Sequence, residues 1–318
     1  MSEGLNIESG IIQTLCYFDV FDYPLTIDEL RKFHPANLAG VALEESLEKL
    51  LKKQFLFCFN GFYSLQNKPE LCQVRSKGNE RAGKMLQTAN RIGKILGQFP
   101  FVKFVGISGS LSKDYADENA DIDYFIITKS GRLWIARTFL HVLKKFSFLF
   151  NKQDWYCMNY FIDENALKIA EENIFTATEV VTLKPVFDQG ILNGFYEANN
   201  WVLPYFPNYT RPSLWPKVLV NENRIKKMLE MILDNRFGSW LDNLCMDVTS
   251  GRWAKKEKKN QLNPQAAPLG LLTGQHFARP NPAHLQKKIL DSFLSKLKRM
   301  EAMTGLFLTE TDDIIITD

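Results

Sequence analysis

The stretch that decides the fold runs from Phe104 to Ile127; it begins FVGISGSLS and ends DIDYFII. Apolar residues bounded by turn residues predict a buried strand over Val102–Ser108 and a second strand over Asp121–Thr128. Between them, Gly109 and Ser110 predict a turn, because glycine adopts backbone conformations that other residues avoid. The stretch therefore predicts two strands with polar groups placed where the chain turns.

Two carboxylates, Asp121 and Asp123, open the second predicted strand. Residues two apart on a strand face the same side, so both carboxylates are expected to project together while Ile122 points into the core. Magnesium takes oxygen ligands and commonly bridges to phosphates through one or two carboxylates. Gly109 lets the backbone approach a phosphate closely, and the Ser110 hydroxyl can bind its oxygens. Together these features predict a site for a metal-bound phosphate compound.

The order and spacing of these residues resemble the nucleotidyltransferase superfamily, which includes DNA polymerase beta, poly(A) polymerases and aminoglycoside nucleotidyltransferases. Its signature is a hydrophobic residue, a Gly-Gly or Gly-Ser pair, a variable gap, and then two acids that flank a hydrophobic residue. Here Ser108 departs from the pattern by taking the hydrophobic place. Gly109 and Ser110 form the pair, and ten residues separate Ser110 from Asp121. The resemblance covers about residues 99–162.

The resemblance implies an α+β fold with a mixed sheet and flanking helices. It also implies transfer of a nucleoside monophosphate from a nucleoside triphosphate to an acceptor hydroxyl, with Mg²⁺, or alternatively Mn²⁺, as the cofactor. The residues implied to bind the nucleotide are Ser108, Gly109, Ser110, Ser112 and Lys113. The residues implied to be catalytic are Asp121, Asp123 and Asn159, and the first two of these hold the metal.

A third carboxylate, which the family usually carries on a later strand, is not evident in this sequence. The expected strand, Trp155–Ile162, contains no acid, and Asn159 is its only strongly polar interior residue. Asp154 and Asp163 flank the strand, and Glu179 on a following helix is another candidate for the role. The missing acid keeps a second hypothesis open. In that hypothesis the chain is a catalytically degenerate member of the fold that binds or regulates, through DNA or protein contact.

The first 66 residues predict a separate module. Three expected helices and an Asn-Gly hairpin between aromatic runs resemble a winged-helix domain. The expected helices cover residues 11–21, 26–33 and 41–53, and the hairpin covers residues 55–65. The third helix carries Glu44, Glu45 and Glu48, which repel nucleic-acid phosphates. A role in protein contact or in covering substrate is therefore favoured over DNA reading.

The remaining chain predicts a connecting helix over residues 67–98, a catalytic core over 99–188 and a helical domain over 189–318. Residues 132–150 are expected to form a helix of the core. Beyond Asp163 the expected helices cover residues 164–173, 176–185, 189–199, 223–234 and 283–300. Residues 251–263 are expected to be a basic, solvated stretch, residues 264–282 a long loop, and residues 314–316 a short strand at most.

Composition narrows the class of protein without naming a substrate. The net charge of +3 permits a nucleic-acid partner but does not demand one. The cysteines lack the spacing of a zinc site, so free thiols in a reducing cytoplasm are expected, mostly packed as small hydrophobes. No apolar run is long enough to span a bilayer, and no membrane partner is expected. The expected partners are a nucleoside triphosphate and an acceptor that the sequence does not identify.

Overall fold

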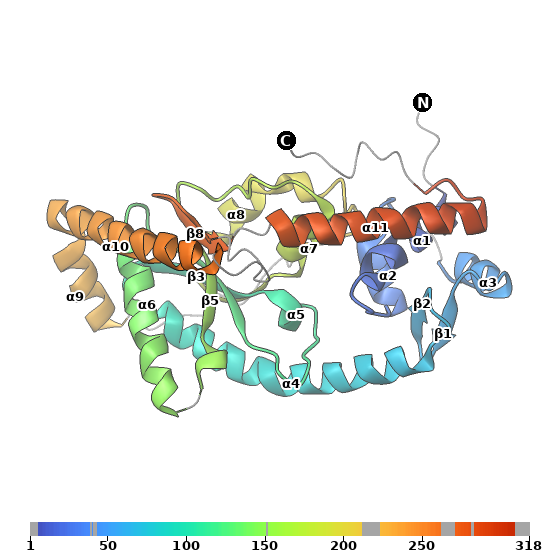
Figure 1. The fold of residues 1–318 in the computed structure, drawn as a ribbon, viewed down its shortest axis with the longest axis horizontal. Coiled ribbons are helices and arrows are strands. Elements are labelled where there is room, and N and C mark those ends of the chain that lie inside the picture. Colours follow the sequence, from blue (N-terminus) through green and yellow to red (C-terminus); the bar gives the residue numbers. More distant parts are fainter. Residues whose placement is uncertain are drawn as a thin grey trace.

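The computed structural model describes residues 6–38, 40, 43–150, 152–211, 223–261, 271–280 and 283–308. Over these residues the chain is a mixed α+β protein (Figure 1). The helices are α1 (Ile7–Asp19), α2 (Ile27–Phe33), α3 (Glu44–Lys52), α4 (Pro69–Gly97), α5 (Gly109–Ser112), α6 (Leu133–Ser147), α7 (Ile174–Thr182), α8 (Leu192–Ala198), α9 (Arg224–Leu233), α10 (Arg236–Gln261) and α11 (Ala283–Thr304). The strands are β1 (Phe57–Phe59), β2 (Phe62–Ser64), β3 (Val102–Ile107), β4 (Asp123–Thr128), β5 (Cys157–Asp163), β6 (Lys184–Asp188), β7 (Leu271–Thr273) and β8 (Phe277–Pro280).

A six-stranded mixed sheet has the strand order β6-β3-β4-β5-β8-β7. Strand β3 pairs antiparallel with both β4 and β6, whereas β4 and β5 run parallel. Alternate residues of β4 face opposite sides, as the period of a strand requires. Tyr124 and Ile126 lie in the core beneath α4 and α6, and Phe125 and Ile127 lie in the core on the other face. The sheet is therefore covered on both faces, and the site residues lie at the start of β4.

The long helix α4 connects the N-terminal module to the sheet, and Figure 1 shows it running from the β1–β2 hairpin to the sheet. Near its start, the buried Arg75 forms an ion pair of 2.8 Å with Glu29 of α2 and donates to the carbonyl of Pro24. Glu29 also closes a capping box with Thr26, so the same carboxylate caps the N-terminus of α2 and anchors α4. This pairing fixes the module to α4.

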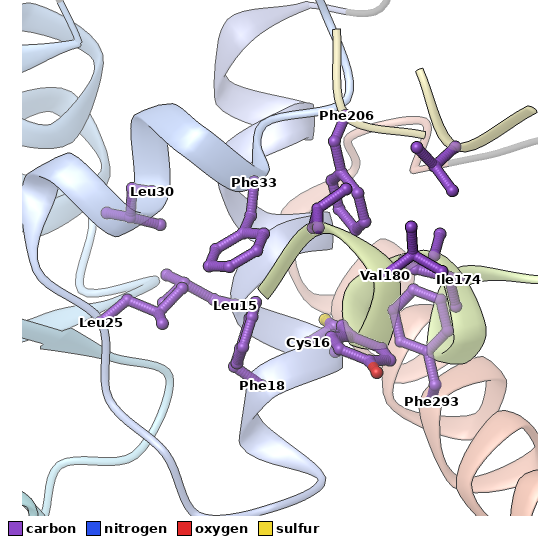
Figure 2. Close-up of a cluster of buried hydrophobic side chains, with 14 of the residues drawn as sticks. Leu15, Cys16, Phe18, Leu25, Leu30, Phe33, Ile174, Val180, Phe206 and Phe293 are labelled. Carbon is purple, nitrogen blue, oxygen red and sulfur yellow. The ribbon is translucent and has the colours of Figure 1, made fainter. Parts of the chain in front are cut away.

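The N-terminal module shares its hydrophobic core with the rest of the chain. Figure 2 shows Phe18 of α1 and Phe33 of α2 in the same cluster as Val180 of α7 and Phe293 of α11. The ring of Tyr17 contacts that of Phe293 edge-on, with the ring centroids 5.6 Å apart. Removal of these apolar side chains from water stabilises the packing of α1 and α2 against α7 and α11. The module is therefore packed against α7 and α11, the helices that border the site.

Several expected elements agree with the structure. The helices expected over residues 11–21, 26–33 and 41–53 correspond to α1, α2 and α3, and the hairpin corresponds to β1–β2. The expected connecting helix corresponds to α4, and the expected strands of the core correspond to β3, β4 and β5. The basic stretch from residue 251 forms the end of α10, where its arginine and lysine side chains are exposed as expected. Residues 314–316 lie outside the described residues.

Two expected elements after Asp163 were wrong, and a third ends earlier than expected. Residues 164–173 form a loop instead of a helix, because Asn199 accepts from the backbone of Ile169 and donates to that of Leu167. The helix expected over 176–185 ends at Thr182, and Pro185 lies in β6, an edge strand where proline is tolerated. The loop expected over 264–282 contains β7 and β8, and β8 pairs with β5. Strands this short depend on a distant partner, which local patterns do not reveal.

Candidate functional site

The turn after β3 is built around Gly109. Ser108 is extended, and its backbone N–H donates to the carbonyl of Asp123 at 3.0 Å, which ties the turn to β4. Gly109 has a φ of +66°, a conformation that favours glycine. An added Cβ at this residue would lie 2.5 Å from Oδ2 of Asp123. The residue is therefore glycine for two reasons, its backbone conformation and the close approach of the carboxylate.

The serines and the lysine that follow the turn have different surroundings. Ser110 is exposed beside the site, as a phosphate-binding role requires. Ser112 is buried, and its hydroxyl donates to the carbonyl of Gly109 at 2.8 Å, so it holds the turn in shape. Lys113 donates to the same carbonyl at 3.0 Å and forms an ion pair of 2.6 Å with Glu179 of α7. The turn thus presents one exposed hydroxyl and one lysine that is already paired.

The two predicted aspartates lie together at the start of β4. Asp123 is the first residue of the strand, whereas Asp121 precedes it, so only one of the pair belongs to the strand itself. Ile122 between them is fully buried, as expected. Burial, and then the neighbouring charge of Asp121, raise the pKa of Asp123 to about 6. Negative charge is therefore crowded at this point, which is the electrostatic setting that a bound cation relieves.

Cys157, which the sequence patterns did not single out, completes this group. It is the residue of β5 directly opposite Asp123 in the parallel pair. The Cys157 Sγ and one carboxylate oxygen each from Asp121 and Asp123 all lie within 4.8 Å of one another. Burial, and then hydrogen bonding with Asp121, raise the pKa of the thiol to about 12. The cysteines were expected to pack mostly as small hydrophobes, and Cys157 is an exception, because its thiol lies beside the two aspartates.

Asn159 reaches the same group through an irregularity in β5. The register of β5 against β4 shifts between Met158 and Tyr160, so Asn159 is the extra residue of a bulge. Its Nδ2 donates to Oδ1 of Asp123 at 3.1 Å and to Sγ of Cys157 at 3.0 Å. The residue expected in the place of the third carboxylate therefore lies at the site, where it donates hydrogen bonds to both neighbours.

Two cavities, both bordered by Gly109, open beside these residues. The first, of about 280 Å³, is bordered by Ser108, Gly109, Asp123 and Asn159 and has otherwise mainly apolar walls. Its aromatic walls come from Phe125, Tyr160, Phe175 and Phe195. Arg279 of β8 also lines it and is held in a two-bond ion pair with Glu171, at 2.6 Å for each bond. Arg279 was not predicted, because its strand was expected to be a loop.

The second cavity, of about 310 Å³, lies between the turn and the N-terminal module. The turn contributes Gly109, Ser110 and Lys113, and α7 contributes Glu179. The module contributes the aromatic side chains of Tyr17, Phe18, Phe21 and Tyr23. Tyr23 also donates a hydrogen bond of 2.5 Å to the carbonyl of Lys113. The module thus forms one wall of the space next to Ser110. Glu179 lines both cavities. Nearby, Lys184 of β6 forms an ion pair with Asp114 and lines neither of these two cavities.

Comparisons with known proteins do not assign the chain to a family. No family model matches the chain, and searches of curated proteins and of solved structures returned no match. Within the described residues, no helix is both long and apolar enough to cross a membrane. Any functional conclusion therefore depends on the chain's own residues.

Proposed function

We propose that this chain is a nucleotidyltransferase that moves a nucleoside monophosphate from a nucleoside triphosphate to an acceptor hydroxyl. The observation that carries the proposal is the convergence of Asp121 and Asp123 beside the Gly109–Ser110 turn. Two carboxylates fit Mg²⁺ or Mn²⁺, which take oxygen ligands, and the crowding of negative charge at Asp123 supports a cation there. The mixed sheet supports the resemblance seen in the sequence.

In the proposed reaction the acceptor oxygen bonds to the α-phosphorus of the nucleoside triphosphate. The bond from that phosphorus to the bridging oxygen breaks, pyrophosphate leaves, and the acceptor proton passes to a base. A divalent cation at Asp121 and Asp123 supplies charge neutralisation on the phosphates. Ser110 and the backbone N–H groups of the glycine turn bind phosphate oxygens. Glu179 is the candidate base, because it lines the same cavity as Asp123.

The N-terminal module is proposed to cover the substrate. Its aromatic side chains form a wall of the cavity that contains Ser110, and Tyr23 is hydrogen-bonded to the segment that follows the turn. The acidic residues of α3 lie on exposed positions, which supports protein contact or substrate cover over DNA reading. The mainly apolar cavity beside Asp123 suits a compact group with little charge, such as a ring of the nucleotide or of a small acceptor.

The second candidate function is a catalytically degenerate member of the same fold that binds or regulates. The observation that favours it is the third position of the site, where β5 offers Cys157 and Asn159 instead of a carboxylate. Both candidates share the fold, but they differ in whether a nucleotide binds with a divalent cation at the aspartates. Nucleotide binding therefore discriminates between them.

The test is calorimetric titration of the protein with each common nucleoside triphosphate in the presence of Mg²⁺. We expect Asp121→Asn and Asp123→Asn each to weaken binding by about tenfold or more, because each removes a metal ligand. Asp154→Asn is the matched control, since this exposed aspartate lies just before β5, outside the metal-ligand group. No binding by the wild-type protein, or equal binding by the Asp121 and Asp123 variants, would contradict the enzyme proposal and favour the second candidate.

A further inference from the structure

The third ligand position of the site holds sulfur. Cys157 lies directly opposite Asp123 in the β4–β5 pair, and its thiol is free of any disulfide. With Asp121 and Asp123 it forms the one group of three potential metal ligands found among the described residues. Strand pairing fixes this position, since Ile122 and Met158 are both buried in the same hydrophobic cluster and resist a shift of register.

The spacing of the three ligand atoms is compatible with a common metal ion. At zinc bond lengths of about 2.0–2.3 Å, a tetrahedral arrangement places two ligand atoms roughly 3.6 Å apart. The present separations of up to 4.8 Å therefore require only small side-chain rotations to close on one ion. Neither Cys157 nor Asp121 belongs to the two hydrophobic clusters, so movement of these side chains leaves the core in place.

Asn159 orients the two ligands that it contacts. Its side-chain amide donates to Sγ of Cys157 and to Oδ1 of Asp123, at 3.0 and 3.1 Å. Metal ligands in proteins are commonly held by such hydrogen bonds from neighbouring groups, and a donated bond also stabilises a thiolate. The bulge therefore places the Asn159 amide where it holds Cys157 and Asp123 in position, although it adds no carboxylate.

We propose that Cys157 is a metal ligand and that the site, together with Asp121 and Asp123, binds a thiophilic divalent cation of the Zn²⁺ type in preference to Mg²⁺. Thiolates favour zinc and related ions, whereas Mg²⁺ takes oxygen ligands. Binding replaces the thiol S–H bond with a sulfur–metal bond and releases the proton to solvent. The inference rests on the proposed function, because it concerns the same site. The proposed function needs only the two aspartates as metal ligands, so binding of a nucleotide with Mg²⁺ is compatible with the inference.

The first test uses Co²⁺ as a spectroscopic substitute for Zn²⁺ on the full chain. We expect cobalt binding to produce a thiolate-to-metal charge-transfer band in the near ultraviolet, which Cys157→Ser abolishes. Cys58→Ser is the matched control and keeps the band, because Cys58 is also free and partly exposed but lies on β1. In the wild-type protein, Zn²⁺ should protect Cys157 from alkylation by iodoacetamide, as measured by peptide mass spectrometry. This readout needs no variant to fold.

A second variant inverts the preference. Cys157→Asp supplies a third carboxylate, so we expect Mg²⁺ to bind about tenfold more tightly and Zn²⁺ about tenfold more weakly than in the wild type. Cobalt binding without the charge-transfer band, or unchanged alkylation of Cys157 in the presence of Zn²⁺, would overturn the inference. If a nucleotide still binds with Mg²⁺ in that case, the proposed function stands. If the wild-type protein binds neither a divalent cation nor a nucleotide, the metal-ligand inference and the proposed function are both refuted.

Discussion

Substitution of Gly109 by alanine tests whether the turn and the carboxylates form one unit. Alanine at a φ of +66° costs about 1–2 kcal/mol of folding free energy from backbone strain alone. The new Cβ would also lie 2.5 Å from Oδ2 of Asp123, so the carboxylate must move, and we expect its Oδ1 to lose the hydrogen bond from Asn159. That loss adds about 1 kcal/mol, for a total of roughly 2–3 kcal/mol. Divalent-cation binding should fall as well.

Gly131→Ala is the matched control for this substitution. Gly131 has a φ of +63°, and an added Cβ there would meet no atom within 4 Å. We expect it to cost only the strain, about 1–2 kcal/mol, in urea unfolding and to leave Mn²⁺ binding unchanged. In an Asp123→Ala background the cost of Gly109→Ala should fall to that of Gly131→Ala, because the contact is gone. Equal costs of Gly109→Ala in both backgrounds, with unchanged Mn²⁺ binding, would refute the reasoning.

Three further predictions concern folding and binding. Arg75→Met should lower the free energy of unfolding by about 3 kcal/mol, because it leaves Glu29 without its partner, and Arg75→Met with Glu29→Gln should recover part of that loss in urea unfolding. Burial, and then the charge of nearby Arg137, lower the pKa of His141 to about 3 from an unfolded value of 6.5, so stability is full above pH 6.5. It should decline below that by about 1.4 kcal/mol per pH unit, and His141→Leu should remove this slope; an unchanged slope would contradict the assignment. Lys113→Met should weaken triphosphate binding by about tenfold in calorimetry, whereas Lys184→Met should not, because Lys184 pairs with Asp114 and lines neither of the two cavities that Gly109 borders.

Local chemistry explains why part of the site could be predicted from the sequence. A Gly-Ser pair after an apolar run requires a turn where it stands, and the structure has Gly109 at positive φ there. Two acids around a buried isoleucine must share a side, and Asp121 and Asp123 do. The capping box of Thr26 and Glu29 is equally local, and it begins α2 as the sequence indicates.

The missed elements depend on partners far along the chain. Strand β8 exists because it pairs with β5, more than a hundred residues earlier, and it brings Arg279 to the cavity that Tyr160 also lines. A three- or four-residue strand has too few positions to display a period, so its pattern resembles that of a loop. The loop over 164–173 shows the converse, because a stretch of mixed polar and apolar residues stays non-helical when Asn199 satisfies its backbone groups.

The third position of the site also depends on a distant partner strand, and it changes how the missing acid is understood. The sequence shows that Cys157 and Asn159 share a strand, but only the register with β4 shows that the cysteine lies opposite Asp123. A search for a third carboxylate within the expected strand Trp155–Ile162 finds none and favours loss of activity. The structure instead places sulfur within ligand range of both aspartates, with an amide that donates to sulfur and carboxylate alike. A change of metal and a loss of catalysis predict different cobalt spectra, so the charge-transfer band decides whether the site has lost a ligand or exchanged one.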